Sequence, residues 1–184
     1  MGGNAFSERL PTALFPRMST AFYNSLKARL IPRLEALYHL VVVPPEAPGK
    51  VDHGDLDILV CHPKNVKEGI PRSECVTPEE IERALGSVYS IPLAGDRTSN
   101  FAIPIQQDEV HQFALDKEEL DLGQLYIQID LHFCEDEESL GSRTLFQSYG
   151  ELGIILGMLG KTVGFTWSPS GLKVGNRECP VLDN

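Results

Sequence analysis

The segment that most restricts the fold is residues 124–133, Gln-Leu-Tyr-Ile-Gln-Ile-Asp-Leu-His-Phe. Its polar residues Gln128, Asp130 and His132 share one face, because side chains two residues apart on a strand point to the same side. The pattern predicts a β-strand anchored by its apolar residues. A lone aspartate in the middle of such a strand is costly unless it is paired or liganded, which makes Asp130 a candidate functional residue.

The rest of the chain mixes helix and strand patterns. Residues 18–38 have apolar side chains at helical spacing, and Pro32 is expected to kink or split that helix. Thr77-Pro78-Glu79-Glu80 is typical of a helix start, and Gly86 of its end. We therefore predict an α/β (α+β) fold, in which helices pack on a mixed β-sheet. Strands are further expected at 39–43, 56–62, 101–106 and 110–115, with the last two as candidates for pairing, a polar helix at 137–148, a buried apolar helix at 152–159, and a hairpin turn at 167–172.

The length of 184 residues is typical of one domain covering 1–184, with a core at about 18–134 and a helix and hairpin at about 137–175. No apolar run approaches the ~18–20 residues of a membrane span, and the first residues lack the basic and apolar parts of a secretory signal. We therefore expect an intracellular protein, cytoplasmic or nuclear, without membrane contact. The oligomeric state is left open.

The net charge of −10 is concentrated in one part of the chain. Residues 108–138 contain eleven acidic residues and a single lysine, so that segment alone has a charge of −10 and the remainder is neutral. Residues 1–38 are mildly basic. A broad basic face for duplex DNA is not supported, whereas a local basic patch near the N-terminus is compatible with the sequence.

A second acidic motif is Gly54-Asp55-Leu56-Asp57-Ile58. On a strand, Asp55 and Asp57 project to one side while Leu56 and Ile58 enter the core. Two adjacent carboxylates repel each other unless a positive group lies between them. A divalent cation bound through oxygens meets that need, and Mg²⁺ is the usual one. Taken without Asp130, Asp55 and Asp57 are better explained by turn and strand-entry roles, since Gly-Asp is common in turns.

The Gly-Asp-Leu-Asp-Ile-Leu-Val and Ile-Asp-Leu-His-Phe stretches together resemble the nucleotidyltransferase superfamily typified by DNA polymerase beta and poly(A) polymerases. The resemblance covers mainly residues 40–133 and implies a polymerase-beta-like core. It implies that Asp55, Asp57 and Asp130 are catalytic and hold two Mg²⁺ (or Mn²⁺) ions. The reaction implied is transfer of a nucleoside monophosphate from an NTP to an acceptor hydroxyl, with release of pyrophosphate. The Met-Gly-Gly-Asn-Ala-Phe opening and the Gly-rich apolar helix are also similar to a subgroup of such proteins from fungi and large viruses.

The chain departs from that family at one place. Members normally have a Gly-Ser pair about ten residues before the Gly-Asp-x-Asp motif, where it opens a helix that cradles the triphosphate. Here that place holds Pro44-Pro45. Gly49, Lys50 and Gly54 are the remaining candidates for nucleotide binding, with Lys50 as the cation. The alternative for Lys50 is a solvated loop lysine.

Several functions remain open on the sequence alone. The acceptor of a transferase would be an RNA or DNA 3′-end, a small molecule or a protein hydroxyl. The main alternative is a catalytically degenerate nucleotidyltransferase fold that serves as a binding or regulatory module, which the Pro44-Pro45 departure favours. A metal-dependent phosphoesterase using the same carboxylates is a third. A zinc site from Cys61, His62, His132 and Cys134 is disfavoured, because their spacing matches no standard zinc module.

Overall fold

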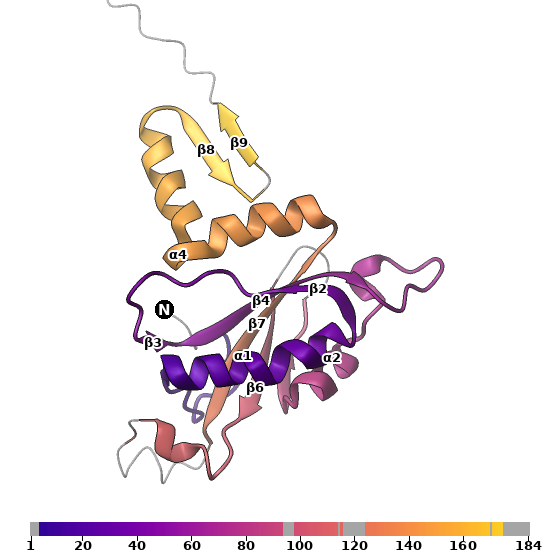
Figure 1. Ribbon diagram of the computed structural model, residues 1–184, viewed down its shortest axis with the longest axis vertical. Coiled ribbons are helices and arrows are strands. Elements are labelled where there is room, and N and C mark those ends of the chain that lie inside the picture. The colour runs from indigo at the N-terminus through magenta and orange to yellow at the C-terminus, as the bar shows by residue number, and fades with distance from the viewer. Residues whose placement is uncertain (1–3, 94–97, 114, 116–123, 170, 175–184) are drawn as a thin grey trace, which may run out of the picture.

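A mixed five-stranded sheet, with strand order β2-β4-β7-β6-β5, is the centre of the molecule (Figure 1). The computed structural model describes residues 4–93, 98–113, 115, 124–169 and 171–174. Strands β4 and β7 are parallel, and the other neighbours in this sheet are antiparallel. The predicted α+β class with a mixed sheet is therefore confirmed. The five strands are β2 (Tyr38–Val42), β4 (Asp55–Pro63), β5 (Tyr89–Ile91), β6 (Thr98–Pro104) and β7 (Tyr126–Cys134).

Helices and two smaller strand pairs complete the described fold. Strand β1 pairs with β3, and β8 forms a hairpin with β9, as the turn pattern near Trp167 predicts. Their bounds are β1 (Met18–Ser19), β3 (Asp52–His53), β8 (Phe165–Ser168) and β9 (Gly171–Val174). The helices are α1 (Thr20–Glu35), α2 (Pro78–Leu85) and α4 (Glu137–Thr162), with single 3₁₀ turns η1 (Arg72–Glu74) and η2 (Val110–Gln112). None of the helices described is long and apolar enough to cross a bilayer.

The central sheet has two apolar faces, and β4 contributes to both. Leu56, Ile58 and Val60 are fully buried in the larger core, to which α1 contributes Leu26 and Leu30 among others. The alternate residues of β4, including Leu59 and Cys61, belong to a smaller cluster with Cys134 of β7 and Leu140 of α4. Because side chains alternate along a strand, Asp55 and Asp57 lie on the side of the sheet that α4 covers.

Helix α1 continues through Pro32 to Glu35, so the expected split at this proline is wrong. Pro32 lies in the last turn, where it removes the one backbone hydrogen bond that its own N–H would donate. Leu30 and Leu34 on either side of it are fully buried, and their packing holds the turn in helical form. Helix α2 begins with the predicted capping box of Thr77 and Glu80.

Residues 110–115 do not form the expected strand. Residues 110–112 form η2, and both edges of β6 are already occupied by β5 and β7. Phe113 is buried because its ring packs edge-to-face against Phe22, with 4.8 Å between the centroids. The apolar residues of this segment therefore indicate packing against α1 rather than pairing with β6. Ala114 lies outside the described residues.

The two helices expected at 137–148 and 152–159 are parts of one helix, α4. This helix bends sharply between them (Figure 1). Tyr149 and Gly150 both have positive φ, 56° and 73°, which interrupts regular helical geometry. The expected burial of 152–159 is wrong for most of its large side chains: Ile154, Ile155, Met158 and Leu159 are 42–62% exposed. This half of α4 packs against the β8–β9 hairpin, which covers only one side of it.

Candidate functional site

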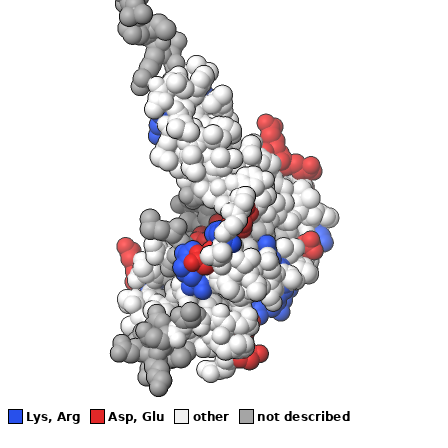
Figure 2. Space-filling model, turned by 60° about the vertical axis from the view of Figure 1, so that its left-hand side comes forward, with Lys and Arg blue, Asp and Glu red and all other residues white. Residues whose placement is uncertain are grey.

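One cavity of about 360 Å³ lies where the start of β4 and the middle of β7 meet α4 and the loop after β2. Figure 2 shows acidic and basic side chains gathered around a hollow on this face, while the protruding part of the molecule above it is almost uncharged. Four of the lining residues are acidic. The lining consists of Tyr23, Pro44, Pro45, Glu46, Lys50, Asp55, Asp57, Asp130, Gln147 and Gly150.

The three aspartates singled out by the sequence all line this cavity. Asp57 and Asp130 are direct neighbours in the parallel pairing of β4 with β7. Asp55 lies two residues before Asp57 on the same side of the same strand. Strand alternation and strand pairing together therefore bring three carboxylates from two segments of the chain to one place.

Burial makes these carboxylates costly to ionise. The pKa of Asp57 is raised from 3.8 to about 7, first by burial and then by the charges of Asp55, Asp130 and Glu46. Burial likewise raises the pKa of Asp55 and raises that of Asp130 to about 6. Crowded, partly desolvated carboxylates of this kind are typical of functional sites. They are stabilised when a cation binds between them.

The Asp130 carboxylate is held by two amides. Its Oδ1 accepts hydrogen bonds from Asn100 Nδ2 at 2.7 Å and from Gln128 Nε2 at 2.8 Å. Asn100 on β6 is the direct strand neighbour of Asp130. The backbone N–H of Ala5 donates to Gln128 Oε1 at 3.2 Å, so the N-terminal segment supports this arrangement. Sequence reasoning missed Asn100, although its polar side chain precedes the apolar residues 101–103.

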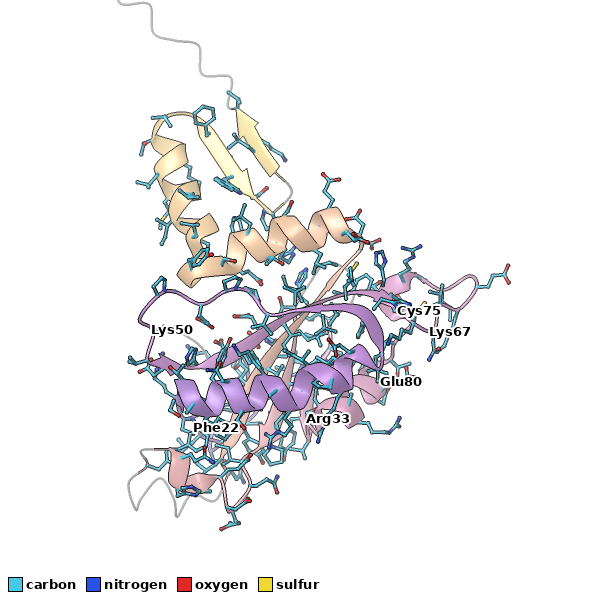
Figure 3. The ribbon with its side chains drawn as sticks, in the orientation of Figure 1. Phe22, Arg33, Lys50, Lys67, Cys75 and Glu80 are labelled. Carbon is cyan, nitrogen blue, oxygen red and sulfur yellow. The ribbon has the colours of Figure 1, made fainter. Side chains whose placement is uncertain are left out.

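Lys50 lines the cavity, but it is not free. Its Nζ lies 2.5 Å from Oε2 of Glu46, a residue that sequence reasoning missed. The other carboxylate oxygen of Glu46 accepts a hydrogen bond from Tyr23 OH at 2.9 Å and lies 3.5 Å from His53 Nδ1. Figure 3 shows Lys50 on the loop between β2 and β3, at the border of the sheet. The loop lysine therefore belongs to a polar cluster that joins this loop to α1 and β3.

The other two candidates for nucleotide binding lie elsewhere. Neither Gly49 nor Gly54 is among the residues that line the cavity. Gly49 has a φ of 76° in the turn closed by the hydrogen bond from Lys50 N to Ala47 O, which explains glycine at this place. Gly54 is buried between β3 and β4.

Two prolines form part of the cavity wall where the family resemblance leads one to expect Gly-Ser. Pro44 and Pro45 carry no N–H donor, so they offer no amide to a phosphate. The Pro45 carbonyl accepts a hydrogen bond from Tyr149 N at 2.7 Å, which fixes the loop against the bend of α4. The same bend places Gln147 and Gly150 in the cavity wall. Gln147 also carries a buried Oε1 without a hydrogen-bond partner.

The ligand chemistry of the cavity fits a hard divalent cation. Carboxylate oxygens are the ligands that Mg²⁺ and Mn²⁺ prefer, and the raised pKa values of Asp57 and Asp130 show that no positive group fully compensates their charge. As placed, no set of three or more His, Cys, Asp or Glu side chains in the described segments is arranged to hold a metal. For Asp130, the two amide hydrogen bonds hold the carboxylate in its present orientation.

No protein-family model matches this chain, and no curated protein matches it. The function of the cavity is therefore inferred from its own residues.

Proposed function

We propose that this chain is a metal-dependent nucleotidyltransferase with a polymerase-beta-like core. In this proposal it transfers a nucleoside monophosphate from an NTP to an acceptor hydroxyl and releases pyrophosphate. The observation that carries the proposal is the meeting of Asp55, Asp57 and Asp130 on adjacent parallel strands in one cavity. The raised pKa of Asp57 supports it, because three carboxylates without a cation between them are unfavourable.

Each aspartate has a role in this reaction. Asp55, Asp57 and Asp130 would hold Mg²⁺ or Mn²⁺, which when bound supplies charge stabilisation for the phosphates and the attacking oxygen. Asp130 would also accept the proton of the acceptor hydroxyl. The hydroxyl oxygen then forms a bond to the α-phosphorus as the bond from that phosphorus to pyrophosphate breaks. Asn100 and Gln128, which donate hydrogen bonds to Asp130 Oδ1, would limit the movement of this carboxylate during the reaction.

On the phosphate side, Lys50 is the cation of the cavity wall. Pro44 and Pro45 replace the expected Gly-Ser pair, so charge rather than backbone amides would provide the contact to the triphosphate. The acceptor would be an RNA or DNA 3′-end, a small molecule or a protein hydroxyl, and the acidic chain disfavours long duplex DNA.

A second candidate is a degenerate nucleotidyltransferase fold acting as a binding or regulatory module. The pairing of Lys50 with Glu46 and the two prolines favour it, because both weaken the phosphate contact. A phosphoesterase built from the same carboxylates is a third candidate.

Incubation with radiolabelled NTPs, Mg²⁺ or Mn²⁺ and a mixed RNA pool separates these functions. Extended or labelled acceptor indicates transfer, free monophosphate indicates hydrolysis, and no product with any NTP favours the module. Asp57→Asn should abolish product formation, because it removes a metal ligand. Asp52→Asn is the matched control: Asp52 is exposed, pairs with Arg17 and does not line the cavity. Equal product from wild type and Asp57→Asn would contradict the proposed chemistry.

A further inference from the structure

We propose that Glu46 is a positioning residue that restrains Lys50 and thereby weakens the binding of an anionic phosphate group in the cavity. This inference rests on the proposed function, because it takes the phosphate group to be that of a nucleoside triphosphate. In the absence of the nucleotide, Lys50 is bound to Glu46. When the nucleotide binds, its phosphate oxygens take the place of Glu46 as partner of the Lys50 ammonium.

The contact between the two side chains is short and partly shielded. Lys50 Nζ and Glu46 Oε2 are 2.5 Å apart, and the side chains are 33% and 28% exposed. Charges that are partly buried are screened less by salt than fully exposed ones. Both side chains line the same cavity as the three aspartates. A phosphate group that reaches Lys50 therefore also meets the carboxylate of Glu46.

Glu46 is held in place from the side opposite Lys50. Tyr23 OH donates a hydrogen bond to its Oε1 at 2.9 Å, and the Tyr23 ring stacks on the His53 ring with 3.9 Å between centroids. The backbone carbonyl of Lys50 accepts a hydrogen bond from Thr20 Oγ1 at 3.2 Å. The carboxylate and the loop are thus both fixed to α1, and Lys50 is the more mobile partner because of its long unbranched stem.

Glu46 is negatively charged throughout the neutral pH range. Burial raises its pKa, but the hydrogen bonds from Lys50 and Tyr23 outweigh that effect and leave the pKa below its ordinary value. Burial also lowers the pKa of His53, so this ring is neutral near pH 7 and adds no compensating charge. The triphosphate therefore competes for Lys50 with a permanent anion, and the replacement of Glu46 by a neutral residue removes that competition.

The test is a double-mutant cycle on nucleotide affinity. Glu46→Gln keeps the shape of the side chain and can still accept the Tyr23 hydrogen bond, but it has no charge. We expect Glu46→Gln to bind ATP with Mg²⁺ about three- to tenfold more tightly than wild type, measured by isothermal titration calorimetry at low salt. The same substitution in a Lys50→Gln background should give a clearly smaller gain in affinity, because the lysine that it releases is absent and only the direct repulsion between Glu46 and the phosphates is relieved.

Glu109→Gln is the matched control, since Glu109 forms a similar ion pair with Arg29 and does not line the cavity. It should leave the ATP affinity unchanged. The gain in Glu46→Gln should shrink as salt rises, which a purely structural role of Glu46 would not produce. If Glu46→Gln does not fold, Glu46→Ala should show the same gain.

Two results would overturn the inference in different ways. Unchanged or weaker ATP binding by Glu46→Gln, with clear binding by wild type, refutes the role of Glu46 and leaves the proposed function intact. No binding of any NTP by wild type or by Glu46→Gln, with or without Mg²⁺, removes the proposed function and this inference with it.

Discussion

Replacement of Asp57 by asparagine tests whether the carboxylates form a strained cation site or a structural one. Asn has nearly the same shape and no charge. In the described part of the chain, no group donates a hydrogen bond to the Asp57 carboxylate. The substitution therefore removes a charge that burial and the neighbouring carboxylates oppose. We expect the metal-free variant to be at least as stable as wild type, and more stable at alkaline pH.

The size of the effect follows from the pKa of Asp57. Its pKa is about 7 in the folded protein against an ordinary 3.8, so the folded state binds more protons between these values and wild-type stability falls as pH rises through this range. At ~1.4 kcal/mol per pH unit, ionisation of Asp57 lowers the free energy of unfolding by about 4 kcal/mol at pH 8 and by about 2 kcal/mol at pH 5. For a chain of this length, 4 kcal/mol corresponds to roughly 8–16 °C in Tm. These are upper bounds, because an unfolded chain retains some charge interactions.

The assay is a set of thermal melts of wild type and Asp57→Asn in chelator, from pH 5 to pH 8. The difference in Tm between the two proteins should grow with pH. Mg²⁺ or Mn²⁺ should raise the Tm of wild type in proportion to the logarithm of its concentration and should have little effect on the variant. In Asp52→Asn no alkaline gain is expected, because the hydrogen bond from Arg17 lowers the pKa of Asp52 and its charge favours the fold.

The reasoning would be refuted if Asp57→Asn melted below wild type in chelator at pH 8 and neither Mg²⁺ nor Mn²⁺ changed the Tm of wild type. Both results are expected if Asp57 has a purely structural role, because its ionised carboxylate would then stabilise the folded state.

Three further outcomes are expected from other parts of the molecule. Asn100→Ala removes one of the two amides that stabilise ionised Asp130, so the pKa of Asp130 should rise above about 6, as carboxyl NMR titration can measure. An unchanged pKa would show that the Asn100 amide does not stabilise the charge of Asp130. Gly153→Ala should lower the free energy of unfolding by ~1–3 kcal/mol in urea melts, because the new Cβ would lie 2.2 Å from the ring of Phe146. Gly141→Ala in the same helix is the control: its Cβ meets nothing within 4 Å, so the free energy of unfolding should rise by ~0.5–1 kcal/mol. Thr77→Ala should cost ~1 kcal/mol through loss of the α2 cap, measured by the same melts, and a neutral result would contradict the capping role.

Features that depend on neighbouring residues in the chain could be predicted from the sequence. The cap of α2 at Thr77 and its end at Gly86 are formed by groups within a few residues of one another. The shared face of Asp55 and Asp57 follows from the two-residue period of a strand. The position of Asp130 in an apolar strand predicted a buried carboxylate, and burial does raise the pKa of this group in the structure.

The tertiary structure alone decided which distant residues meet. The pairing of β7 with both β4 and β6 brings Asn100 to Asp130, and no local pattern specifies which strands become neighbours. The hydrogen bond from Tyr23 of α1 to Glu46 likewise depends on how the loop after β2 folds against that helix. Apolar character alone did not distinguish the buried Phe113 from the exposed Leu159, since burial depends on what the rest of the chain places opposite each side chain. A local sequence pattern thus determines the direction in which a side chain points, whereas long-range packing determines what it meets.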